Sequence, residues 1–282
     1  MIRQYILQIH NRFDFQKVYF FYKDEHPEKV RSKVMIIPLL RLTISSVLLV
    51  YASACDIATR EVSDWVWLFG IPVCVLLDGV DLYLVRVDPL SFIVSLGASF
   101  LLGYLLCSLG FYGGADGRAL VLMAVAMPSY PSTNLLITKV LPLPIFFIFF
   151  SSTIFSIIYP LKVFTLNMID RLRGKRLLNG IEENNPLKRL VLYVTARRVT
   201  FETLKEGLKY FPAETVILEE GEARRTPIYF LHAEANIDEL VEQLEEHREL
   251  FDDGVLASPT TPMIVFQTVG FLFVNLILYW PF

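Results

Sequence analysis

Residues 35–55, MIIPLLRLTISSVLLVYASAC, decide the fold class of this chain. A helix needs about 20 mostly apolar residues to cross the hydrocarbon core of a bilayer, and this stretch meets that length. Arg41, near its start, is its only charged residue. Asp56 follows it directly, and the chain then becomes polar. The stretch therefore predicts a membrane-spanning helix with a carboxylate at its end.

Five more apolar runs follow, at residues 65–77, 90–111, 115–127, 141–164 and 262–279. The chain is 54% hydrophobic, with a mean hydropathy of +0.48. We predict a polytopic α-helical membrane protein with about six transmembrane helices. Residues 35–169 form a membrane core with five of them, and residues 258–282 carry the last. The second run requires Asp78 and Asp81 to lie at the membrane interface.

A polar segment, residues 170–257, separates the fifth run from the sixth. Sequence patterns typical of strands occur at residues 190–195, 215–218 and 227–231, and patterns typical of helices occur at 200–210 and 236–250. Mixed patterns of this kind are typical of a folded unit rather than a disordered linker. We predict a small cytoplasmic α/β insertion, a soluble domain held between membrane helices.

Lys and Arg set the expected orientation, because they are enriched in cytoplasmic loops. Arg60, Arg118 and a long basic run after residue 161 place loops one, three and five inside the cell. The polar N-terminal extension, residues 1–34, carries much positive charge and violates this topology. Translation starting at Met35 would remove most of that charge, so the true start, Met1 or Met35, stays open.

The composition argues against several other classes of function. The net charge is only −3, which gives no electrostatic basis for binding nucleic acid. The four histidines and three cysteines show no metal-ligand spacing. We therefore expect no metal and no cofactor, and we expect the lipid bilayer to be a partner of the chain.

Two aspartates stand where membrane helices begin or end. Asp56 ends the first run, and Asp116 begins the fourth. The predicted topology puts both at the cytoplasmic end of the bundle, where two close carboxylates share a proton. One can then take a proton from water while the other donates one to a peptide carbonyl. This arrangement predicts an aspartyl protease, and Gly113 and Gly114 are expected to let the backbone turn sharply before Asp116.

The residues around the two aspartates resemble a known family. Residues 56–62, DIATREV, and 113–116, GGAD, are similar to the two motifs of archaeal preflagellin peptidases and of type IV prepilin peptidases. Both belong to the GxGD class of membrane aspartyl proteases. Ala115 departs from the glycine at the third position of that motif. The resemblance covers about residues 36–282.

This resemblance implies an enzyme that removes a short basic leader peptide from archaellin or type IV pilin-like precursors at the cytoplasmic face of the cell membrane. It implies Asp56 and Asp116 as catalytic residues and Gly113, Gly114 and Ala115 as the supporting loop. Prepilin peptidases often carry paired cysteines and methylate their products, and those pairs are missing here.

Plainer interpretations stand beside these. Glu61 and Asp64 are either solvated loop residues or contacts for the basic leader. Arg60 and Arg118 are either charge anchors on the cytoplasmic side or groups near the dyad. The alternative function is a non-enzymatic membrane protein, such as an ion- or proton-coupled transporter or an assembly factor, that uses the same two aspartates.

Overall fold

The computed structural model describes residues 27–83, 89–130, 140–141, 143–205, 209–219, 222–229 and 237–279. Most of the expected polar extension, up to residue 26, lies outside them. Residues 27–34 lie inside and already belong to the first helix, α3.

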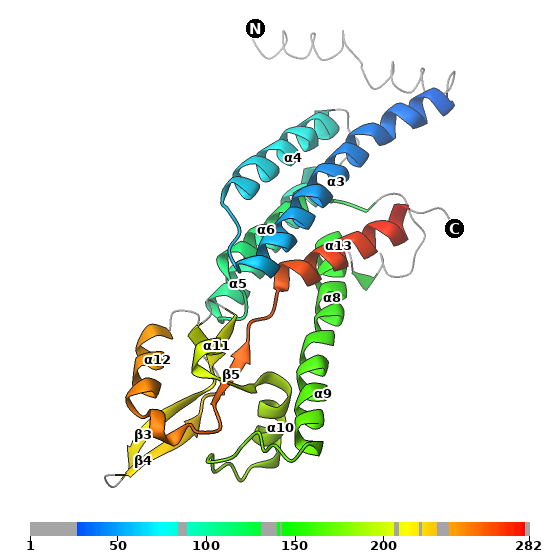
Figure 1. Ribbon diagram of the computed structural model, residues 1–282. Coiled ribbons are helices and arrows are strands. Elements are labelled where there is room, and N and C mark those ends of the chain that lie inside the picture. Colours follow the sequence, from blue (N-terminus) through cyan, green and yellow to red (C-terminus); the bar gives the residue numbers. More distant parts are fainter. Residues whose placement is uncertain are drawn as a thin grey trace.

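Among the described residues, seven helices form the apolar part of the chain, and Figure 1 shows their arrangement. They are α3 (Pro27–Ala58), α4 (Trp65–Tyr83), α5 (Pro89–Ser108), α6 (Gly114–Ala126), α8 (Pro144–Ser156), α9 (Ile158–Leu172) and α13 (Met263–Tyr279). Four stretches of this described part are long and apolar enough to cross a membrane: Ile36–Ala58, Trp65–Tyr83, Pro89–Ser108 and Pro144–Leu172. The predicted class, an α-helical membrane protein, is confirmed. The helices expected to be the fourth and sixth spans are shorter, with 13 residues in α6 and 17 in α13.

Helix α6 is the centre of the bundle. Its residues from Ala119 to Ala126 are all buried, and α3, α4, α5, α8 and α13 pack around it. Glycines allow two close crossings, as is common between membrane helices. A Cβ on Gly103 of α5 would lie 3.4 Å from the Cα of Gly117 of α6, and a Cβ on Gly270 of α13 would lie 2.2 Å from the Oγ of Ser152 of α8.

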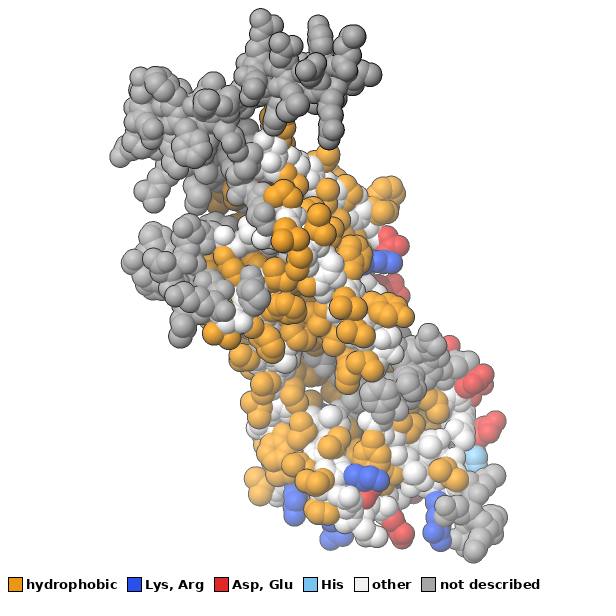
Figure 2. All heavy atoms as spheres, turned by 180° about the vertical axis from the view of Figure 1, so that it is seen from behind, with side chains coloured by type: hydrophobic (Ala, Val, Ile, Leu, Met, Phe, Trp, Pro, Cys, Tyr) orange, Lys and Arg blue, Asp and Glu red, His pale blue; other side chains and the backbone are white. Residues whose placement is uncertain are grey.

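The outer surface of the bundle is apolar. Leu68 and Phe69 of α4, Phe100 and Leu101 of α5 and Ile154 of α8 are all more than half exposed. Figure 2 shows such side chains covering most of the visible face of the bundle. A soluble protein rarely exposes so large an apolar area, so this surface fits lipid.

A buried ionic cluster holds two aspartates of α4. Asp78 and Asp81, which were predicted at the membrane interface, are both 0% exposed and pair with Arg41 of α3. The Nε of Arg41 also donates to the carbonyl oxygen of Ala126 at 2.9 Å. That carbonyl is at the C-terminus of α6, where the helix dipole favours a cation. Opposite charges inside the bundle, rather than water, therefore balance the two aspartates.

Between α9 and α13 lies a small α/β unit, as predicted. Its elements are α10 (Pro186–Thr195), β1 (Arg197–Val199), α11 (Phe201–Lys205), β2 (Tyr210–Pro212), β3 (Glu214–Glu219), β4 (Glu222–Pro227), α12 (Ile237–Glu246), the 3-10 helix η1 (Arg248–Leu250) and β5 (Val255–Pro259). Strand β5 is central in an antiparallel sheet of order β1-β5-β2, and β3 pairs with β4.

The local predictions for this unit had mixed outcomes. The strand at 215–218 is confirmed within β3, and the helix at 236–250 corresponds to α12 and η1. The strand expected at 190–195 is wrong, because these residues end helix α10, whose first turn is capped by the side chain of Asn185. The strand expected at 227–231 overlaps β4 only at Pro227, and residues 230–231 lie outside the described residues. Of the helix expected at 200–210, α11 covers Phe201–Lys205, residues 206–208 lie outside the described residues, and Tyr210 already belongs to β2.

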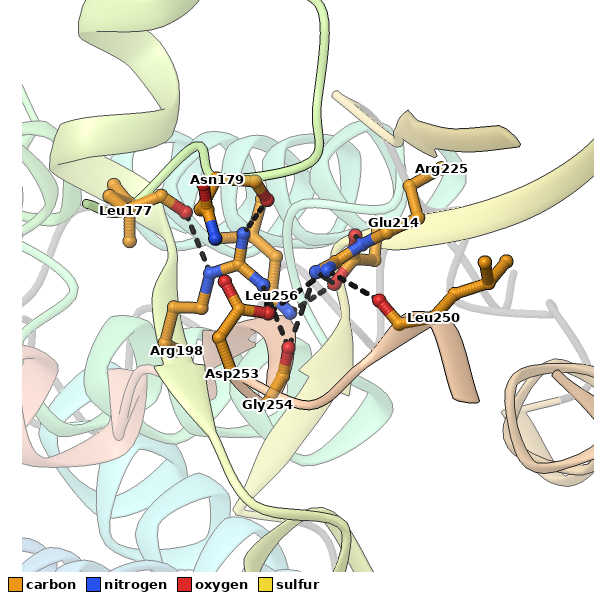
Figure 3. Close-up of polar contacts among 9 residues, drawn as sticks. All are labelled: Leu177, Asn179, Arg198, Glu214, Arg225, Leu250, Asp253, Gly254 and Leu256. Carbon is orange, nitrogen blue, oxygen red and sulfur yellow. Dashed lines mark hydrogen bonds and ion pairs between the residues drawn. The ribbon is translucent and has the colours of Figure 1, made fainter. Parts of the chain in front are cut away.

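Glu214 and Arg225 tie this unit together (Figure 3). Both carboxylate oxygens of Glu214, which is 0% exposed, accept hydrogen bonds of 2.9 Å from Arg225. Glu214 also accepts from the backbone N–H of Leu256 in β5. Arg198 and Arg225 both donate to the carbonyl oxygen of Gly254, at 2.7 and 3.2 Å. The strand that leads into α13 is thus fixed to the hairpin and to β1.

Candidate active site

Asp56 lies in the last turn of α3, with only 8% of its surface exposed. Arg60, just beyond the helix, turns back in the left-handed conformation at φ 61°, which is unusual for a residue other than glycine. Its Nη1 lies 3.7 Å from the Oδ1 of Asp56. Its Nη2 donates to the carbonyl oxygen of Thr260 at 2.9 Å, and the hydroxyl of Tyr159 donates to the same oxygen at 3.0 Å. Arg60 therefore links α3 to the approach to α13.

Asp116 lies in the first turn of α6. Its Oδ2 accepts a hydrogen bond of 2.9 Å from the backbone N–H of Gly113, so the carboxylate caps its own helix. The sharp turn expected at Gly113 and Gly114 is made earlier. Gly110 has a φ of 73°, whereas Gly113 has an ordinary φ of −79° and Gly114 is not left-handed. Ala115 packs against the bundle core, so its methyl group is accommodated.

Helix α13 contacts both aspartates through its first turns. The backbone N–H of Ile264 interacts with the carboxylate of Asp56. The side-chain amide of Gln267 donates to the backbone carbonyl oxygen of Asp116 at 3.3 Å and also bonds to the hydroxyl of Tyr112. Ile264 and Gln267 are three residues apart and so lie on one face of the helix. This face spans the gap between the ends of α3 and α6.

Gln267 and Tyr112 were not singled out from the sequence. Gln267 is 0% exposed and Tyr112 is 7% exposed. The sequence did contain a signal for Gln267, because it is one of few polar residues in the apolar sequence of α13. Polar groups inside membrane helices are functional candidates. Tyr112 gave no comparable signal, since aromatic residues are common near membrane interfaces.

The charges of the site act on one another. The carboxylates of Asp56 and Asp116 lie close enough to repel each other, and the positive charge of Arg60 acts on both. Arg60 was predicted to be either a charge anchor or a group near the dyad, and the structure puts it beside Asp56. Two carboxylates and one guanidinium thus interact at one end of the bundle.

Glu61 and Asp64 lie farther out. Both are exposed, and Asp64 forms an ion pair with Arg118, whose side chain is 50% exposed. Within the described residues, neither forms a hydrogen bond or an ion pair with Asp56 or Asp116. A pocket of about 860 Å³ lies in the α/β unit near Asp170 and Arg197 and includes neither Asp56 nor Asp116. Within the described ranges, no three His, Cys, Asp or Glu side chains are grouped to hold a metal ion.

The fold and this site define a multi-pass helical membrane protein with two facing acidic helix ends. The profile of the type IV leader peptidase family matches residues 43–161, which include both aspartates. A preflagellin peptidase of Methanococcus voltae is 31% identical over 170 residues, which cover 57% of this chain and 68% of that protein. The chain therefore belongs to the type IV leader peptidase family. No solved structure matches it.

Proposed function

We propose that this chain is an intramembrane aspartyl endopeptidase that removes the short basic leader peptide of preflagellin or type IV pilin-like precursors. In this proposal Asp56 and Asp116 activate water as a dyad at the cytoplasmic end of the bundle. Membership of a leader peptidase family supports the peptidase activity over the transporter or assembly-factor alternative. The preflagellin peptidase relative supports the choice of substrate.

The observation that carries the proposal is the bridge made by α13. One turn of this helix contacts the carboxylate of Asp56 through Ile264 and the backbone of Asp116 through Gln267. This bridge supports a common depth for two acids from distant parts of the chain. Asp56 Oδ2 is buried and keeps no hydrogen bond of normal geometry among the described residues, so it is available to a water molecule.

The chemistry follows from that placement. With one proton shared between them, the ionised carboxylate removes a proton from water, and the water oxygen attacks the scissile carbonyl carbon. The protonated carboxyl donates to the carbonyl oxygen, which gives a neutral tetrahedral intermediate. Its collapse breaks the C–N bond, and the leaving amine takes back a proton from the dyad. Arg60 limits the repulsion between the two carboxylates while they exchange protons.

Exposed acids outside the dyad suit a basic leader. Glu61 and Asp64 are exposed farther out than the dyad, and in this proposal they attract Lys and Arg of the leader, with Asp64 exchanging its ion pair to Arg118 for one to the leader. The hydrophobic helix that follows the leader enters from the lipid and packs on the apolar outer surface of the bundle. We propose six membrane crossings, with α6 and α13 as the fourth and sixth, and with the α/β unit and the dyad toward the cytoplasm.

The deciding experiment is processing of a tagged preflagellin precursor, co-expressed with the full chain and followed by its mobility on a gel. Asp56→Asn and Asp116→Asn should each abolish cleavage, because asparagine keeps the size of the side chain but cannot transfer a proton. Asp252→Asn, an exposed acid of the α/β unit, is the matched control and should cleave normally. Full cleavage by either dyad variant at normal protein levels would refute the dyad.

A further inference from the structure

Helix α10 presents an apolar face to the outside. Leu187, Leu190 and Val191 are 71%, 52% and 44% exposed and follow the i, i+3, i+4 spacing of a single helix face. Leu192, on the opposite face, is only 1% exposed and fills the core of the α/β unit. A soluble unit has no reason of its own to expose such a stripe, so the face requires a partner.

The same surface continues on α9. Leu161, Ile169 and Leu172 are exposed there, and they extend the lipid-facing side chains of α8. Helices α10 and α9 pack directly against each other. Figure 2 shows apolar side chains on the bundle and again on the α/β unit below it. The outer faces of α9 and α10 therefore form one platform, named here the α9–α10 platform.

The length of α8 and α9 indicates where this platform lies. Their 29 residues, Pro144–Leu172, rise roughly 44 Å at 1.5 Å per residue. The hydrocarbon core is only about 30 Å thick. Figure 1 shows α9 continuing the line of α8 from the bundle toward the α/β unit. The end of α9, and α10 packed against it, therefore lie beyond the hydrocarbon core, at the level of the headgroups.

Charge identifies the partner. The stretch from the end of α9 into α10 exposes six basic residues: Arg171, Arg173, Lys175, Arg176, Lys188 and Arg189. Two acids nearby have partners: Asp170 pairs with Arg197, and Glu183 bonds to Tyr229. Glu182 is exposed. The chain as a whole has a net charge of −3, so this concentration of positive charge is local. It repels a basic leader peptide and a second copy of itself, and it attracts anionic headgroups.

We propose that the α9–α10 platform lies on an anionic phospholipid leaflet. Leu172, Leu187, Leu190 and Val191 enter the boundary between headgroups and acyl chains, while the surrounding Arg and Lys side chains contact the phosphates. The platform holds the α/β unit against the membrane, independently of the dyad. An amphipathic helix with basic flanks is the usual form of such an interfacial anchor.

The test uses the full chain with Cys55, Cys74 and Cys107 replaced and a single spin label at Leu172→Cys or Val191→Cys. Glu239→Cys, on the acidic helix α12 of the same unit, is the matched control. Each protein is placed as one copy per nanodisc of phosphatidylcholine, with or without phosphatidylglycerol. Collision of the label with oxygen, which concentrates in lipid, is compared with collision with a water-soluble nickel complex.

With phosphatidylglycerol, labels 172 and 191 should collide mainly with oxygen and label 239 mainly with the nickel complex. Arg173→Glu/Arg189→Glu should shift label 191 toward the nickel complex, because it reverses charge without touching the apolar stripe. Labels 172 and 191 that match label 239 in both lipid mixtures would overturn the proposal. Spin–spin broadening, which reports a second copy of the chain, would also overturn it. So would protection of the labels from the nickel complex that changes neither with phosphatidylglycerol nor with the charge reversal.

Discussion

The Nη1 of Arg60 lies 3.7 Å from the Oδ1 of Asp56, although Arg60 stands two residues beyond the end of α3 and adopts a left-handed backbone. An exposed charge anchor has no need of that conformation. The side chain turns back over the helix end and joins Asp56 to the carbonyl oxygen of Thr260. The pair gives the site one fixed positive charge beside two negative ones.

Arg60→Gln should lower the rate of precursor cleavage by about tenfold to hundredfold, a rise in the barrier of about 1.4–2.7 kcal/mol. The glutamine leaves the two carboxylates without their positive neighbour. Arg60→Lys keeps the charge at the same left-handed position and should retain most of the rate. Single-turnover cleavage in detergent measures the effect apart from substrate binding. Equal rates for the two variants would show that the charge of Arg60 does not matter.

Gln267→Leu should reduce cleavage by about tenfold, near 1.4 kcal/mol, while leaving membrane insertion unchanged. Leucine fills the same buried space but cannot hydrogen-bond to the backbone of Asp116 or to Tyr112. Asn275→Leu is the matched control, because Asn275 is another amide on α13, and its hydrogen bond among the described residues is to Phe271 of the same helix, at 2.8 Å. Similar losses in both variants would indicate a general effect on α13 rather than on the site.

Arg41→Met should destabilise the bundle by about 3–5 kcal/mol, since it leaves buried carboxylates without their counter-ion. Arg41→Met/Asp78→Leu should recover part of this loss, because it removes one of those carboxylates as well. Thermal unfolding in detergent measures both variants against Thr43→Ala, an exposed position on α3. A double variant no more stable than Arg41→Met would show that the ion pair is not the cause.

Asp253 makes the stability of the α/β unit depend on pH. Burial alone would raise the pKa of Asp253, but its hydrogen bond to Arg225 and the charge of Arg198 outweigh burial and hold the pKa below its usual range. A lowered pKa stabilises the fold fully above the usual pKa of about 3.9, and this contribution is lost as the pH falls through the lowered value.

Asp253→Asn should therefore weaken the α/β unit at neutral pH, and its difference from the unchanged protein should disappear in acid. Hydrogen exchange of the β1 and β5 amides across this pH range measures the difference. Asp252→Asn, at the exposed neighbouring position, should exchange like the unchanged protein at every pH. A gap that stays constant into acid would mean that the ionised carboxylate is not responsible.

The proposed orientation can be read from thiol labelling in intact cells, in a background lacking Cys55, Cys74 and Cys107. Cysteines at Thr59 and Asp252 should react with a small charged reagent only when it reaches the cytoplasm. A cysteine at Tyr83, at the opposite end of α4, should react from outside. Labelling of Thr59 from outside would invert the topology and separate the dyad from a cytoplasmic leader.

The sequence predicted best what depends on local patterns. Within the described residues, the apolar runs located the helices of the bundle, with α8 and the first half of α9 in a single run. A membrane helix must satisfy its backbone within itself and therefore needs a continuous apolar segment. The amphipathic sequence pattern of α12 also correctly predicted a helix. Asp56 and Asp116 as a catalytic pair remain a prediction, which the processing experiment tests.

What the sequence missed depends on contacts between distant residues. Arg41 pairs with Asp78 across 37 positions, so local patterns did not reveal the ion pair. The contact of Gln267 with Asp116 spans 151 positions. Residues 190–195 have the β-branched and aromatic composition of a strand, but the cap at Asn185 and packing on α9 make them helical. Tertiary packing overrode the local preference there.

Three residues, 260–262, separate β5 from α13. A peptide of that length can extend by no more than about 10 Å, and Thr260 is already held by Arg60 and Tyr159. The α/β unit and the first turn of α13 are therefore mechanically coupled through this short connection. Deleting the unit would also free the first turn of α13, so a shortened enzyme has to keep both.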